Sequence, residues 1–210
     1  MTVTSFEIRL CQSCGLRYPL TTDHPFGERC PTCLGETQVI LKRTIDSLPL
    51  GERTRVRGNF LALLDNIRSA WNVGSIFRTA DGFGISKLFL CGITPTPENE
   101  AMRKTSLGAE ETVTWEYSQN ALETAKKIKS GGYTLIALEQ DERAKPIEES
   151  HSLLPQKAVL IVGNEIAGVD PELLDLCDHI VHIPMYGQKH SFNVEVAFAI
   201  AIYALRSQMV

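Results

Sequence analysis

The sequence predicts an α/β protein with a mostly parallel sheet, preceded by a small four-cysteine zinc-ribbon-like segment. From Asn59 onward, short apolar runs alternate with stretches of helical periodicity, the pattern of strands and helices in a parallel sheet covered on both faces. Before that point, four of the six cysteines fall within the first 33 residues, in two CxxC pairs. We therefore expect a zinc-ribbon-like domain at 1–40, a basic linker at 41–58 and an α/β domain at 59–210.

The two pairs, Cys11-x-x-Cys14 and Cys30-x-x-Cys33, have the spacing of a four-cysteine zinc site. Each pair can turn tightly and direct two thiolates to one side, so that two pairs complete a tetrahedron. A segment this short can hardly form a core of its own, and a bound metal would supply the missing stability. The alternatives are a redox pair or disulfides, and disulfides would not persist in a reducing compartment.

The linker is locally rich in positive charge. It contains five basic residues and two acidic ones, namely Lys42, Arg43, Arg53, Arg55 and Arg57 against Asp46 and Glu52. Two interpretations remain open at this point, a solvated linker with scattered charge or an arm that contacts phosphate groups.

The α/β domain is expected to contain strands at 60–64, 87–91, 112–117, 133–139, 158–162 and 180–183. Helices are expected at 73–83, 98–105, 121–129 and 194–205, with a further helix starting at Pro171 and a polar connection at 141–155. Asn72 is the expected N-cap of the first helix and Gly84 its stop signal. Asp170 followed by Pro171 is a strong helix start.

Composition and missing motifs exclude several function classes. The 43% hydrophobic and 22% charged content is typical of a soluble globular protein, and there is no apolar run long enough to span a membrane. The first residues lack the pattern of a secretory signal, so we expect a cytoplasmic protein. A net charge of −4 argues against coating nucleic acid by charge alone. The motifs GxGxxG, GxxxxGK[ST], HExxH and GxSxG are all missing.

Three segments place polar residues inside otherwise apolar patterns. The first has Asn72 before a helix and Arg78 within it, where Arg78 could equally be a surface residue that extends its charge to solvent. The second is Gly163-Asn164-Glu165, at the end of an apolar strand, which could also be a tight turn with an exposed acid. The third contains Ser191 and Asn193, either of which could simply cap the last helix. His190 in this loop is a further candidate for substrate contact.

Together and in this order, the three segments resemble the motifs of the SpoU (TrmH-type) RNA ribose methyltransferases of the SPOUT superfamily. The matching residues are Asn66, Asn72-Val73-Gly74, Arg78-Thr79-Ala80, Val162-Gly163-Asn164-Glu165, Gly168-Val169, Ile183-Pro184-Met185, Gly187 and Ser191-Phe192-Asn193-Val194. Lys104 to Glu110 also resembles the family's middle segment. The resemblance covers about residues 59–207.

The resemblance implies a SPOUT-type α/β knot, in which a mostly parallel sheet ends in a C-terminal trefoil knot. It further implies that S-adenosylmethionine (SAM) binds in the knotted loops, that the protein is a homodimer with sites completed by both chains, and that the methyl group goes to a ribose 2′-hydroxyl of tRNA or rRNA. The residues carried over as catalytic are Asn72, Arg78, Glu165, Ser191 and Asn193. Those carried over for SAM binding are Leu138, Gly163, Asn164, Glu165, Ile183, Met185, Ser191 and Phe192.

Two positions depart from the family pattern. Phe192 replaces a usual leucine, and Glu195 stands where a small polar residue is common, which leaves the packing of the loop against the last helix open. Two other functions also remain open, a non-catalytic knotted RNA-binding protein and a zinc-ribbon interaction module fused to a small-molecule α/β enzyme. The four-cysteine segment itself could recognise RNA or act as a structural cap.

Overall fold

The computed structural model describes residues 5–21, 28–44, 59–152 and 157–206. The chain divides into two compact units, Met1–Thr54 and Arg55–Val210, which are described separately below. Most of the basic linker lies outside the described residues. Within the described ranges, no helix is long and apolar enough to cross a membrane.

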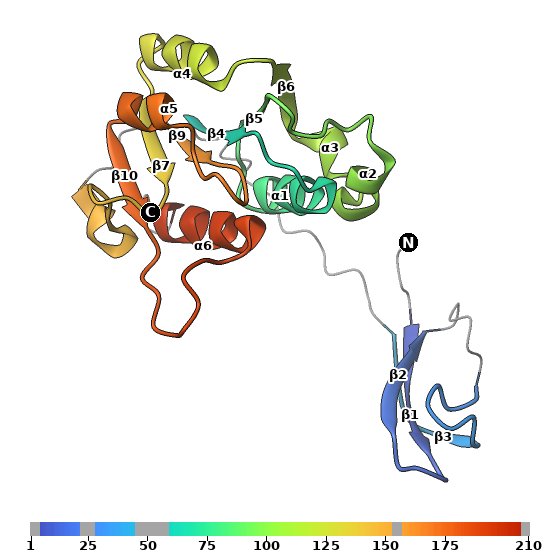
Figure 1. Ribbon diagram of the computed structural model, residues 1–210. Coiled ribbons are helices and arrows are strands. Elements are labelled where there is room, and N and C mark those ends of the chain that lie inside the picture. The colour runs from blue at the N-terminus through green and yellow to red at the C-terminus, as the bar shows by residue number, and fades with distance from the viewer. Residues whose placement is uncertain (1–4, 22–27, 45–58, 153–156, 207–210) are drawn as a thin grey trace. The chain divides into compact units, whose positions relative to one another are not determined.

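The N-terminal unit is a three-stranded antiparallel sheet (Figure 1). Its strands are β1 (Ser5–Cys11), β2 (Arg17–Thr21) and β3 (Thr37–Thr44), in the order β2-β1-β3. The expected domain boundary at residue 40 falls inside β3, whose last residue, Thr44, still pairs with Ser5. Hydrophobic periodicity missed this strand because a register shift interrupts it opposite Ile8 and because almost all its side chains are exposed.

The larger unit contains the predicted parallel sheet. Its strands are β4 (Asn59–Asp65), β5 (Lys87–Cys91), β6 (Thr114–Ser118), β7 (Thr134–Leu138), β8 (Lys145–Pro146), β9 (Lys157–Val162) and β10 (His179–His182). Their order is β6-β5-β4-β9-β7-β10-β8, and every pairing among these described strands is parallel. The predicted α/β class with a mostly parallel sheet is therefore confirmed.

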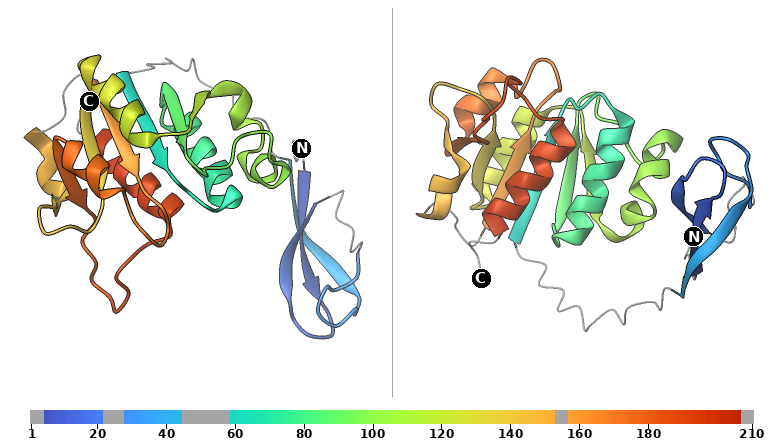
Figure 2. Two further views of the ribbon diagram at one scale, coloured as in Figure 1. Left: turned by 45° about the horizontal axis from the view of Figure 1, so that its top comes forward. Right: turned by 90° about the horizontal axis from the view of Figure 1, so that it is seen from below.

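Helices cover both faces of this sheet (Figures 1 and 2). They are α1 (Ala70–Gly82), α2 (Glu100–Ser106), α3 (Ala109–Thr112), α4 (Ala121–Ser130), α5 (Pro171–Leu176), α6 (Val194–Arg206) and a 3-10 helix at Ile147–Ser152. One core lies between the sheet and α1 and α6, with Phe77 and Phe198 fully buried. The other lies under α4 and α5, around Ile161 and Leu173. The expected elements are thus present, while β8, α3 and the 3-10 helix are additions.

The start of α1 corrects the expected N-cap. Ser69 caps the helix, because its hydroxyl oxygen accepts a hydrogen bond from the Asn72 N–H at 3.3 Å. The helix therefore begins at Ala70, and Asn72 lies in its first turn. Serine and asparagine are similarly good N-caps, so sequence alone could not choose between them. The consequence matters for function, because the Asn72 amide is available for other contacts.

Candidate active site

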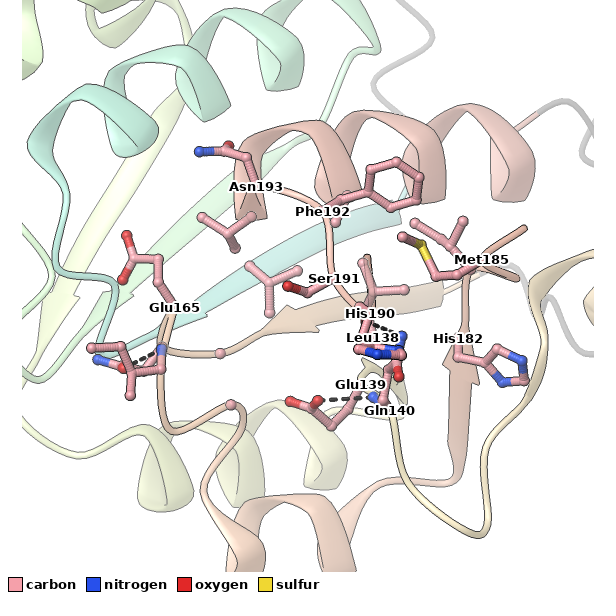
Figure 3. A pocket seen from close by; sticks show the side chains of 18 residues that line it. Leu138, Glu139, Gln140, Glu165, His182, Met185, His190, Ser191, Phe192 and Asn193 are labelled. Atoms are coloured by element: carbon pink, nitrogen blue, oxygen red, sulfur yellow. Dashed lines mark hydrogen bonds between the residues drawn. The ribbon is translucent and has the colours of Figure 1, made fainter. Parts of the chain in front are cut away.

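A pocket opens at the carboxyl ends of β7, β9 and β10 and is closed on one side by the loop before α6 (Figure 3). Its volume is about 560 Å³, within the usual range of about 300–1,000 Å³ for small-molecule sites. Strand carboxyl ends are where open parallel sheets bind ligands. The lining residues are Leu138, Glu139, Gln140, Val162, Gly163, Asn164, Glu165, Ile166, Gly168, His182, Ile183, Met185, His190, Ser191, Phe192, Asn193, Val194 and Ala197.

The structure brings the residues expected to bind SAM into this one pocket. They come from four places in the chain: the end of β7, the turn after β9, the loop after β10 and the entry to α6. All eight line the pocket, namely Leu138, Gly163, Asn164, Glu165, Ile183, Met185, Ser191 and Phe192. In Figure 3 the Ser191 side chain lies between Glu165 on one side and Met185 on the other.

The turn after β9 depends on its two glycines. Asn164 and Gly168 exchange two backbone hydrogen bonds of 2.9 Å, which closes the turn. A Cβ atom at Gly163 would lie 2.2 Å from the Gly168 carbonyl carbon, and Gly168 has a φ of +74°. Larger residues would collide at the first position and be strained at the second. The backbone of the two segments therefore approaches closely, and the turn directs Glu165 toward α1.

Glu165 holds the turn that leads into α1. Its carboxylate accepts hydrogen bonds from the Arg68 N–H at 2.9 Å, the Ser69 N–H at 3.1 Å and the Asn72 amide at 2.9 Å. Partial burial opposes ionisation, but hydrogen bonds from Arg68, from its own backbone N–H, from Asn72 and from Ser69 prevail. Together they hold the pKa of Glu165 below its usual value. The carboxylate is therefore ionised at neutral pH and occupied by donors.

Asn193 joins this network and also caps α6. Its amide nitrogen donates to the Asn72 side-chain oxygen at 3.0 Å, while its own side-chain oxygen accepts from the Glu195 N–H at 2.9 Å. Asn193 therefore caps α6 and also lines the pocket, so the cap does not exclude its predicted role in the site. Glu195, which departs from the family pattern, accepts a hydrogen bond from the Thr79 hydroxyl at 3.3 Å and so connects α6 to α1.

Of the five predicted catalytic residues, Glu165, Ser191 and Asn193 line the pocket, and Asn72 lies outside the lining but is bonded to Glu165 and Asn193. Arg78 is neither part of the lining nor bonded to these residues. It is exposed on α1. No hydrogen bond or ion pair reaches its guanidinium from the described residues. Arg78 and Asn72 are six residues apart, so they lie on different sides of the helix.

Glu139 and Gln140 are pocket residues that the sequence analysis missed. The Glu139 carboxylate accepts a hydrogen bond from the Val169 N–H at 2.9 Å, and the Gln140 amide donates to the His190 carbonyl at 2.6 Å. These bonds connect the end of β7 to the turn after β9 and to the loop before α6. The available signal was position, because polar residues that directly follow a parallel strand lie at the ligand-binding edge of the sheet.

The buried carboxylate of Asp65 helps to hold the loops that form the site. Asp65, at the end of β4, is buried and accepts hydrogen bonds from the Asn66 amide at 2.8 Å and the Asp170 N–H at 2.9 Å. Burial raises the pKa of Asp65 above its usual value, although these two donors oppose the shift. Asn66, with a φ of 56°, also accepts from the Asn164 amide through its backbone carbonyl at 2.7 Å. The loops after β4 and β9 are thereby tied together.

The four cysteines of the N-terminal unit converge. Their sulfur atoms all lie within 4.8 Å of one another, with Cys11 and Cys33 at 3.4 Å and Cys14 and Cys30 at 3.6 Å. A tetrahedron with Zn–S bonds of about 2.3 Å has edges of about 3.8 Å. The residue after each pair, Gly15 or Leu34, has a left-handed backbone, with φ of 73° and 58°. The donor set and the geometry fit a single zinc ion.

The fold and the pocket together define the class of the larger unit as a ligand-binding parallel α/β domain with its site at the strand carboxyl ends. Residues 59–203 match the model of the SpoU rRNA Methylase family, which covers more than half of the chain. The protein therefore belongs to this family.

Named relatives agree with this membership. The chain is 33% identical over 146 residues to the 23S rRNA (guanosine(2553)-2′-O)-methyltransferase of Bacillus subtilis, covering 69% of this chain and 56% of the relative. It is 29% identical over 152 residues to the tRNA (guanosine(18)-2′-O)-methyltransferase of Aquifex aeolicus, covering 71% and 70%. The AdoMet-bound rRNA methyltransferase from Sinorhizobium meliloti superposes with a TM-score of 0.65 at 25% identity, covering 72% of this chain and 57% of that one.

Proposed function

We propose that this protein transfers the methyl group of SAM to a ribose 2′-hydroxyl of tRNA or rRNA. The observation that carries the proposal is the pocket formed by the second and third motif segments and the end of β7. The first motif segment joins it through Asn72, which bonds to Glu165 and Asn193. Family membership and the names of the relatives support the same reaction. Because the chain spans only 56% and 70% of these two relatives, the choice of RNA is a separate question.

The pocket suits SAM by size and by charge. Leu138, Ile183, Met185 and Phe192 offer apolar surface for a purine, and Glu139 and Glu165 are acidic, whereas none of the described lining residues is Lys or Arg. Such a lining favours a ligand with positive charge over a polyphosphate nucleotide. When bound, SAM supplies an electrophilic methyl group on a sulfonium centre. The residues of the chain must then orient the ribose hydroxyl and manage its proton.

Glu165 acts as a positioning residue and not as the base. Its lowered pKa makes it a weak proton acceptor, and its oxygens already accept three hydrogen bonds from the turn before α1 and from Asn72. Through Asn72 it fixes Asn193 at the pocket rim. Ser191 offers a hydroxyl within the pocket. The hydroxyl proton then passes to another nearby acceptor, a carboxylate or a phosphate of the substrate RNA.

Arg78 stabilises the negative charge that develops on the ribose oxygen. Arginine stays protonated at neutral pH and is suited to this electrostatic role. Since Arg78 lies outside the pocket of its own chain, we propose a homodimer in which each copy supplies Arg78 to the pocket of the other. The exposed apolar face of α6, with Val196 and Tyr203 and the adjoining Phe192, supports an interface there.

A C-terminal trefoil knot completes the proposed fold. In the sheet, β9 lies between β4 and β7, and β10 lies on the other side of β7. The chain must therefore leave β7, insert β9 on one side of it, and cross back to add β10 on the other. This path supports a knot around the pocket loops, although knots are rare in proteins.

The N-terminal unit is proposed to hold a structural zinc ion and to recognise RNA. The near-tetrahedral arrangement of Cys11, Cys14, Cys30 and Cys33 supports the metal. The unit is appended to a domain whose own pocket accounts for the cofactor, which supports a role in selecting the substrate. A reducing cytoplasm, which keeps cysteines free to bind metal, is the proposed location.

Labelled SAM and deproteinised total RNA test the proposed reaction. We expect label in the RNA and resistance of the modified ribose to alkaline cleavage, since a 2′-O-methyl group blocks attack on the neighbouring phosphate. The modified nucleotide is then mapped from the gap in the cleavage ladder. SAM binding without transfer to any RNA would instead indicate a non-catalytic RNA-binding protein, and turnover independent of RNA would indicate a small-molecule enzyme.

A further inference from the structure

Three large apolar side chains at the carboxyl edge of the sheet are exposed beside the pocket. Ile93 follows β5 and Ile166 follows β9, while Trp71 lies in the first turn of α1, the helix after β4. Their exposed fractions are 65% for Ile93, 59% for Trp71 and 79% for Ile166. The strands β5, β4 and β9 are parallel neighbours, so the segments that follow them meet at one edge. We refer to Ile93, Trp71 and Ile166 as the apolar rim. An exposed cluster of this kind indicates a binding surface.

The backbone around the rim is fixed although its side chains are exposed. The Ile93 N–H donates to the Asn66 side chain at 3.1 Å, which ties the loop after β5 to the end of β4. The turn before Trp71 is held by Glu165, the neighbour of Ile166. The Ile166 N–H donates to the Asn164 side chain at 2.9 Å. A surface held in place in this way loses little conformational entropy when a ligand binds.

A cation without an ion-pair partner accompanies the aromatic ring. Arg68 is exposed three residues before Trp71. Within the described parts of the chain, no side chain forms an ion pair with Arg68, and no ring or hydrogen-bond acceptor contacts the Trp71 indole. The acidic residue near Arg68 is Glu165, whose carboxylate accepts hydrogen bonds from three other donors and not from the Arg68 guanidinium. The surface thus combines an exposed indole, aliphatic neighbours and one positive charge.

We propose that the apolar rim and Arg68 bind an unpaired nucleotide of the substrate RNA, adjacent to the nucleotide that is methylated. The base stacks on the Trp71 indole against Ile93 and Ile166, and Arg68 contacts a phosphate. Stacking on aromatic side chains and phosphate contacts from arginine are the usual elements of single-stranded RNA binding. Adjacency follows from Arg78, which lies seven residues after Trp71 and therefore on the same side of α1, and which is the residue proposed to act on the ribose oxygen. This inference rests on the proposed function.

Steady-state methylation of deproteinised total RNA by the full chain tests the rim. Trp71→Ala should raise the KM for RNA about tenfold or more, the size expected for one lost base–aromatic stack, and leave the KM for SAM unchanged. Trp71→Phe should restore most of the loss, because a phenyl ring still stacks. Arg68→Gln should raise the KM for RNA and reduce its salt dependence. Lys126→Gln on α4, where Lys126 pairs with Glu123, is the matched charge control and should change neither KM.

Tryptophan fluorescence gives a second measurement that does not depend on activity. The chain has two tryptophans, so Trp115→Phe leaves Trp71 as the only one. A ten-nucleotide single-stranded RNA of mixed sequence should quench this protein, and the same RNA in a duplex should not.

Three outcomes would contradict the proposal that the apolar rim binds an unpaired nucleotide. They are no quenching by the single strand, an unchanged KM for RNA in Trp71→Ala, and a change in oligomeric state of that variant, which would make the rim a contact between copies. In each case methylation by the wild type would leave the proposed function standing. Absence of methyl transfer by the wild type would remove that function itself.

Discussion

The two units of the chain are stabilised in different ways. Among the described residues of the N-terminal unit, the buried apolar side chains are Cys11, Leu20 and Cys30 alone, and two of these belong to the four-cysteine cluster. The larger unit has two extensive cores, one on each face of its sheet. The small unit also buries Arg9, whose guanidinium pairs with Glu7 at 2.8 Å and donates to Thr37. A buried ion pair contributes little net stability.

This difference separates what maintains the fold from what performs the function. In the larger unit, apolar packing maintains the sheet, and the strand ends are left for polar site residues. In the small unit, the same four cysteines must provide stability and set the shape of the surface. We therefore expect the small unit to respond to metal removal, and the larger unit to respond to changes in its core.

The largest expected effect is metal removal. Cys11→Ser, or a strong zinc chelator, should unfold the N-terminal unit completely, since structural zinc contributes on the order of 10 kcal/mol to small domains. Affinity for SAM should not change, because the pocket belongs to the other unit. Zinc content per chain measures metal binding, limited proteolysis measures folding of the N-terminal unit, and calorimetric titration measures affinity for SAM. Loss of SAM binding together with zinc would contradict the independence of the two units.

A substitution in the core of the larger unit should destabilise that unit and leave zinc binding by the small unit unchanged. Phe77 on α1 is fully buried, and Phe77→Ala should destabilise the larger unit by about 3–5 kcal/mol through lost burial and a residual cavity. Zinc content should stay at one ion per chain. Denaturant unfolding followed by the fluorescence of Trp115, which packs against the core, measures the first quantity. A simultaneous loss of zinc would show that the small unit depends on the large one.

The parts of the fold that the sequence predicted are those with strong periodicity or unambiguous caps. The expected strand at 158–162 and helix at 194–205 match β9 and α6 within one residue. The short α3 and β8 were missed because four and two residues are too few to display a period. The start of α1 was misplaced because two good capping residues, Ser69 and Asn72, compete there.

The candidate site was predicted from motif positions, and its geometry was not. The resemblance assembled the eight expected pocket residues from distant segments, which periodicity could not have done. It did not reveal that Glu165 is occupied by the turn before α1, or that Glu139 and Gln140 connect three loops, because these contacts join residues 30 to 97 positions apart. It did imply sites completed by both chains, and the position of Arg78 outside the pocket of its own chain is compatible with that expectation.

Arg78 provides the sharpest contrast within the larger unit, because it directly follows Phe77 in α1 but is exposed. Arg78→Ala should reduce kcat by a hundredfold or more, the usual cost of removing a group that stabilises developing charge, with little change in unfolding free energy. Arg78→Lys should recover part of the loss. If each copy acts on the other's pocket, mixing Arg78→Ala with Asn193→Ala should restore activity in the mixed dimer. No recovery on mixing would remove the proposed exchange between copies.

The smallest expected effect is the pH response of Glu165. Because its pKa in the folded protein lies below its ordinary value of 4.5, its contribution to stability is fully present above that value and is lost as the pH falls through the lowered pKa. The bonds to Arg68, Ser69 and Asn72 should weaken over that acidic interval and should be unchanged between pH 6 and 8. Glu165→Gln should be less stable than the wild type at pH 7, and the difference should disappear as the pH falls below the lowered pKa. Thermal unfolding midpoints of the two proteins across this range measure the difference. A difference that stays constant with pH would mean that the carboxylate acts through its shape and not its charge.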